Sequence, residues 1–111
     1  MRKYFKSFVS NFHYGYAMQF MKSGFENEDE KERVISSSIK HIAKAKKWAA
    51  TSLDKVQCKI VEARLGFING EMNNAKSLKL EAIELLNDVE QHEKEILKLQ
   101  SVLNNIFKPT Y

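Results

Sequence analysis

Four side chains of this sequence could do catalytic or metal chemistry, and their spacing argues against the common mechanisms. They are three histidines and one cysteine: His13, His41, His92 and Cys58. His92-Glu93 lacks the second histidine that a zinc-protease helix places one turn later. Val89 stands where a di-iron bundle carries the glutamate that precedes its histidine. The sequence therefore predicts no metal site.

The sequence also offers no evident nucleophile. Cys58 has no histidine near it in sequence and falls on the outer side of its expected helix, so we expect an inert surface thiol. A glycine-rich phosphate loop and a nucleophile elbow are both missing from the sequence. One cysteine cannot build an internal disulfide framework, which agrees with a reducing compartment. We therefore expect neither an enzyme nor a bound cofactor.

Residue types suited to binding are more prominent. An outward stripe of the expected first long helix carries Lys40, Lys44, Lys47 and Trp48. A tryptophan beside basic residues and outside a helical seam is typical of an interface anchor. The alternative is that Trp48 covers the N-terminal helix and belongs to the core, because tryptophan is seldom left uncovered.

Aromatic side chains also recur near the N-terminus at spacings of one, three and four residues. This pattern describes an amphipathic helix over residues 1–22 with a strongly aromatic face. Tyr4, Phe8 and Phe12 are the candidate contact residues on it. The alternative is again that these aromatic residues form part of the core.

The lysine-rich face has a second interpretation, which is nucleic-acid or anionic-ligand binding. Lysines would contact phosphates and Trp48 would stack on a base. Only three arginines are present, however, and the sequence contains no zinc finger or known helix-turn-helix reader. Residues 40–59 carry six lysines and one acid, whereas residues 81–95 carry six acids and one lysine. Such complementary charges often pair neighbouring helices. We therefore rank protein binding first and nucleic-acid binding second.

Two hydrophobic ladders must position these residues. Apolar residues step by four and three from Ile35 to Phe67, and again from Ala75 to Ile106, which indicates helices that bury one seam along their length. The segment 69–73 can turn the chain between them. The predicted fold is all-α, with a long antiparallel, coiled-coil-like helical hairpin. Lys46 and His92 interrupt the ladders, and we expect them to set the register of the seam.

Capping signals predict the bounds of the two long helices as 27–68 and 73–107. Asn27 precedes three acidic residues and is a good N-cap. Thr51-Ser52 offers a second helix start, but the ladder keeps its phase across it, so we favour one continuous helix. Pro109 cannot continue the last helix.

Both long helices carry a second apolar stripe near the turn, which a two-helix seam leaves uncovered. The stripe contains Val61, Leu65 and Ile68 on one helix, and Leu80, Ile83 and Leu86 on the other. Either the aromatic N-terminal helix covers this stripe in a three-helix bundle, or two hairpins pair in a dimeric four-helix bundle. Far from the turn, the hairpin is expected to project as a bare arm. We expect a single domain over residues 1–111 that associates with itself.

The sequence shows neither an apolar run of membrane-spanning length nor a signal-peptide pattern in its first residues. We therefore expect a cytoplasmic protein, with attachment of the N-terminal helix to a membrane surface as a minor alternative. The expected function is non-enzymatic protein–protein interaction, as an adaptor, a chaperone-like partner or a small inhibitor.

Overall fold

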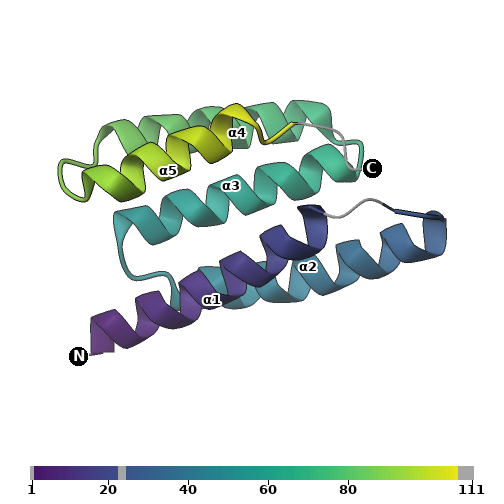
Figure 1. The fold of residues 1–111 in the computed structure, drawn as a ribbon, viewed down its shortest axis with the longest axis horizontal. Coiled ribbons are helices and arrows are strands. Elements are labelled where there is room, and N and C mark those ends of the chain that lie inside the picture. Colours follow the sequence, from purple (N-terminus) through teal and green to yellow (C-terminus); the bar gives the residue numbers. More distant parts are fainter. Residues whose placement is uncertain (1, 23–24, 108–111) are drawn as a thin grey trace.

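The computed structural model describes residues 2–22 and 25–107, which form five α-helices and no strand (Figure 1). The helices are α1 (Arg2–Lys22), α2 (Glu28–Trp48), α3 (Ser52–Ile68), α4 (Met72–Asn87) and α5 (Glu93–Asn104). The predicted all-α class is confirmed. Asn27 is the N-cap of α2, as predicted, and its side chain accepts a 2.8 Å hydrogen bond from the Glu30 backbone N–H.

The expected continuous helix over 27–68 is wrong, because α2 ends at Trp48 and α3 begins at Ser52. Thr51 and Asp54 form a capping box. The Thr51 hydroxyl accepts from the Asp54 N–H at 3.1 Å, and the Asp54 carboxylate accepts from the Thr51 N–H at 3.1 Å. This local capping starts a new helix in spite of the unbroken ladder.

The expected continuous helix over 73–107 is also wrong, because residues 88–92 separate α4 from α5. His92 precedes α5 in the left-handed conformation, with φ at 67°, and its side chain is exposed. Histidine tolerates this conformation better than most residues. Neither polar ladder residue lies in a seam: Lys46 is also exposed, with its Nζ 3.5 Å from Glu62 Oε1.

The turn between α3 and α4 lies where the sequence predicts it. Gly70 takes a φ of +80°, and the Glu71 N–H donates a 2.7 Å hydrogen bond to the Gly66 carbonyl. Glycine adopts this left-handed conformation without the steric cost that a side chain adds.

The helices pack in three layers, with α3 in the middle layer between α1–α2 and α4–α5 (Figure 1). Helix α3 buries Val56, Ile60 and Ala63 in a cluster with α4 and α5, and it buries Val61 and Ile68 in a cluster with α1 and α2. The described residues fill 42 × 26 × 21 Å, without the bare two-helix arm expected from the sequence. Helices α1 and α2 therefore cover the second apolar stripe on α3, whereas Leu80 on α4 stays 61% exposed.

Candidate interaction surface on α1 and α2

A row of aromatic side chains on α1 is the main apolar feature exposed on the molecule. Spaced four residues apart along most of its length, the row contains Tyr4, Phe5, Phe8, Phe12, Tyr16 and Phe20. We call these six residues the aromatic ridge. Tyr4 is 80% exposed, and Phe20, the least exposed member, is still 37% exposed. Contiguous exposed apolar patches of this kind mark interaction sites on soluble proteins.

The ridge is exposed because α1 packs on α2 through its opposite, small-residue side. Ser10, Ala17 and Met21 are fully buried, and the Ser10 hydroxyl donates a 2.8 Å hydrogen bond to the Ala45 carbonyl. Small side chains let the two helix backbones approach closely. The expectation that the aromatic face would cover the stripe is therefore wrong about the face, although α1 does cover it.

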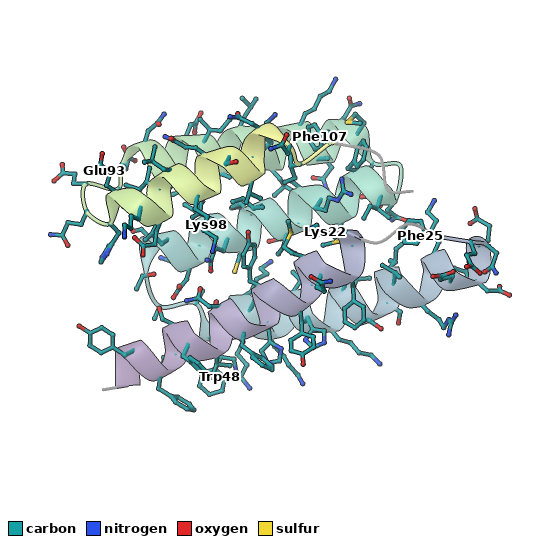
Figure 2. All side chains as sticks on the ribbon, viewed as in Figure 1. Lys22, Phe25, Trp48, Glu93, Lys98 and Phe107 are labelled. Atoms are coloured by element: carbon teal, nitrogen blue, oxygen red, sulfur yellow. The ribbon has the colours of Figure 1, made fainter. Side chains whose placement is uncertain are left out.

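Helix α2 adds two aromatic rings to the same surface. Trp48 is half-buried and meets Phe5 edge to face, with the ring centroids 6.1 Å apart. Figure 2 shows Trp48 on the outer side of the α1–α2 layer, away from α3. His41 stacks on Tyr16, with centroids 5.2 Å apart and an interplanar angle of 13°, and on Phe20 at 5.8 Å. Trp48 is therefore partly covered by α1 while one part of it remains open to solvent.

His13 on α1 and His41 on α2 form a direct pair beneath the ridge, with their Nδ1 atoms 2.8 Å apart. One ring donates and the other accepts, which requires that at least one ring is neutral. Burial lowers the pKa of both histidines, and the positive charge of Lys44 lowers both further. Sequence reasoning missed this pair, because it assigned α2 to a different partner helix. An antiparallel pairing of α1 and α2 centred on residue 27, midway between His13 and His41, would have placed the two histidines opposite each other.

The charged residues on α1 and on residues 33–48 of α2 are all basic, whereas the start of α2 carries Glu28, Asp29, Glu30 and Glu32. Helix α1 and residues 33–48 of α2 contain nine lysines and arginines and no aspartate or glutamate. The predicted contact residues Lys40, Lys44 and Lys47 are all exposed, and the Lys47 Nζ lies 5.7 Å from the Trp48 ring centre. Helix α3 separates these lysines from the acidic helices α4 and α5 (Figure 1). Most of the basic surface is therefore not neutralised by the acids of residues 81–95, in contrast to the pairing expected from sequence.

The structure brings all seven predicted contact residues onto the α1–α2 layer. Tyr4, Phe8 and Phe12 lie on the ridge, and the three lysines and Trp48 lie on α2 beside it. Sequence reasoning did not single out Phe5, Tyr16, Phe20 or His41. The four-residue spacing that runs from Tyr4 to Phe20 was the available signal for Tyr16 and Phe20.

The prediction of a surface position for the Cys58 thiol is wrong. Cys58 is buried rather than on the surface, and burial raises the pKa of its thiol to about 11. A thiol with such a pKa is almost fully protonated at neutral pH and is a poor nucleophile. No group of three or more histidine, cysteine, aspartate or glutamate side chains within residues 2–22 and 25–107 is arranged to hold a metal ion.

No family model, curated protein or solved structure matches this chain. Among the described residues, no helix combines the length and apolar character needed to cross a bilayer. The fold and surface together define a five-helix bundle with an exposed aromatic and basic layer on one side.

Proposed function

We propose that this protein is a non-enzymatic interaction protein that binds another protein through the aromatic ridge and the adjoining lysines of α2. The observation that supports this proposal is the exposure of six large aromatic side chains in one row. Aromatic residues, and tryptophan above all, carry much of the binding energy at protein interfaces. An adaptor, a chaperone-like partner and a small inhibitor all use such a surface.

The ring geometry favours a protein over a nucleic acid as the ligand. Bases stack on ring faces that are open to them. Here His41 already stacks on both Tyr16 and Phe20, and Phe12 packs on Tyr16 with centroids 4.7 Å apart. One face of Tyr16 and one face of Phe20 are therefore already taken by His41, and the stacked rings form an apolar surface that suits the side chains of a protein partner.

The charge pattern favours a different protein over a second copy of this chain. Two copies that met face to face through the ridge would bring the exposed Lys40, Lys44 and Lys47 of each copy together, and α1 and residues 33–48 of α2 contain no acid to pair with them. Like charges at an interface oppose association. Self-association through this surface is therefore a weaker proposal than the binding of an unrelated partner.

Site-specific photo-cross-linking in cells tests the proposal. We would place a benzoylphenylalanine at Phe8 or at Phe12, and at the control positions Leu80 and Leu97, which are exposed apolar residues on α4 and α5. We expect a discrete cross-linked protein from the two ridge positions and not from the controls. Equal cross-linking from all four positions, or none from the ridge, would count against the proposal.

Nucleic-acid binding remains the second candidate, because the excess of basic residues is also what a phosphate backbone needs. Titration of a labelled single-stranded oligonucleotide at two salt concentrations separates the candidates. A nucleic-acid site would lose affinity steeply as salt rises, in proportion to the phosphates contacted. We expect weak binding that does not depend on Phe8 or Phe12.

A further inference from the structure

The α1–α2 surface contains a hole of the kind that a partner helix fills. A shallow hollow of about 340 Å³ lies on α1 and is lined by Asn11, Phe12, Gly15, Tyr16 and Gln19. These five residues lie on one face of the helix, spaced by one turn, with Gly15 at the centre. A Cβ atom built on Gly15 would meet nothing within 4 Å. When helices pack, a side chain of one inserts into a hole formed by several residues of the other.

The dimensions of the ridge suit a helical partner. From Tyr4 to Phe20 it spans 16 helical steps, or about 24 Å at the helical rise of 1.5 Å per residue. A helix of about four turns would lie along this length. Its apolar face would meet the ridge through residues three and four apart, as in other complexes of a helix with an apolar surface.

The charges beside the ridge determine which residues the partner helix should carry on either side of its apolar face. Lys40, Lys44 and Lys47 are exposed along one side of the ridge. No acidic residue of α1 or of residues 33–48 is present to attract a basic ligand. Complementary charge favours a partner with aspartate and glutamate beside its apolar face, and like charge rejects a basic one.

We propose that the partner segment is an acidic amphipathic helix that lies along α1 and α2 and inserts one apolar side chain into the hollow at Gly15. This inference rests on the proposed function and specifies the chemistry of the partner.

Three synthetic peptides that share one amphipathic apolar pattern test the proposal. Their flanking positions carry glutamate, glutamine or lysine, and none contains tryptophan. Trp48 is the only tryptophan of the chain, and it lies beside the ridge, so its fluorescence reports binding. We expect the glutamate peptide to bind about tenfold more tightly than the glutamine peptide, and the lysine peptide to bind least.

Two variants connect any binding to the surface. Gly15→Gln places a side chain in the hollow, where a Cβ atom meets nothing within 4 Å. It should lower the affinity for the glutamate peptide by about tenfold. A triple replacement of Lys40, Lys44 and Lys47 by glutamine should remove the preference for glutamate over glutamine and leave binding of the glutamine peptide unchanged. Leu80→Gln, at an exposed position of α4, is the control and should change the affinity for none of the peptides. Far-ultraviolet circular dichroism of each variant verifies that the fold is intact.

The outcomes separate this inference from the proposed function. Equal affinity for the glutamate and glutamine peptides would overturn the acidic partner, while the apolar surface would still bind a protein helix. Binding that Gly15→Gln leaves unchanged would overturn the insertion at Gly15. If no peptide bound and an oligonucleotide or an anionic vesicle did, and Phe8→Ala abolished that binding, both proposals would be overturned.

Discussion

The guanidinium of Arg64, buried in α3, donates a 2.7 Å hydrogen bond to the carbonyl oxygen of Ile106, just beyond the end of α5. It donates a second hydrogen bond, of 3.2 Å, to the carbonyl of Met21 in the last turn of α1. Carbonyls at the C-terminal end of a helix lack partners within that helix and carry the negative end of its dipole. One cation of the middle layer therefore joins the ends of helices from the two outer layers.

We expect Arg64→Met to lower the free energy of unfolding by about 3 kcal/mol, because hydrogen bonds to a charged donor are lost and buried carbonyls are left without it. Urea denaturation followed by circular dichroism measures this change. Lys98→Met, at an exposed position of α5, is the control and should stay within about 0.5 kcal/mol of the parent protein. A loss for Arg64→Met no larger than the control would show that Arg64 does not join the layers.

The capping box at the start of α3 gives a second prediction. Thr51→Ala should cost about 1 kcal/mol, and Thr51→Ser should cost little, because serine keeps the capping oxygen. Asp54→Ala should cost more than Thr51→Ala, because the Asp54 carboxylate accepts hydrogen bonds from the Ala50 and Thr51 N–H groups and from the Ser7 hydroxyl. Urea denaturation ranks the three variants. A larger loss for Thr51→Ala than for Asp54→Ala would contradict the larger contribution of the Asp54 carboxylate.

The sequence could predict the helical class, the turn before α4 and the start of α2, because each depends on local signals. The periodicity of apolar residues could not show that the helix breaks before α3. The linker 49–51 has three residues, close to the 3.6 residues of one helical turn. The spacing of the apolar residues therefore stays in phase even though the helix breaks there. The capping signal at Thr51 and Asp54 was the better indicator there, because it acts on the backbone directly.

The exposure of the aromatic ridge could not be predicted from composition. Phenylalanine is usually buried, so an aromatic helix face is normally expected to face the core. The side that α1 buries depends on its partner, and Ala17 and Ser10 fit closely against α2 where larger rings would not. The relationship of His13 to His41 depends on the same pairing of helices. Tertiary packing, which a single sequence does not reveal, therefore determines which residues form the candidate site.

Two glycines provide a matched test of helix packing. A Cβ atom on Gly66 would lie 3.3 Å from the Ala75 Cβ and 3.4 Å from the Glu71 carbonyl oxygen, whereas Gly15 has open space. Gly66→Leu should therefore force α3 and α4 apart and cost about 1–3 kcal/mol. Gly15→Leu should raise the free energy of unfolding by up to about 1 kcal/mol, because glycine is a poor helix former. Thermal and urea unfolding compare them, and similar effects at the two positions would contradict the close approach of α3 and α4.

The histidine pair predicts a dependence of stability on pH. Burial holds the pKa of His13 and His41 below the ordinary value of 6.5, and Lys44 lowers both further. The unfolded chain therefore binds more protons than the folded one between the lowered and the ordinary pKa, so stability falls as pH drops through this window. The neutral pair already holds one proton between the two Nδ1 atoms, and one added proton can bind the Nε2 atom of the donor ring. A second added proton would set two N–H groups against each other at 2.8 Å.

We expect the melting temperature to be nearly constant above about pH 7 and to decline as the pH falls below about 6.5. A double variant, His13→Asn with His41→Asn, should flatten this decline while keeping the separate loss at lower pH where carboxylates titrate. Thermal unfolding across the pH range measures both curves, and His92→Asn, at an exposed histidine, serves as the control that keeps the parent slope. A decline that persists unchanged in the double variant would place the titrating group elsewhere and would refute a role for the pair in holding α1 against α2.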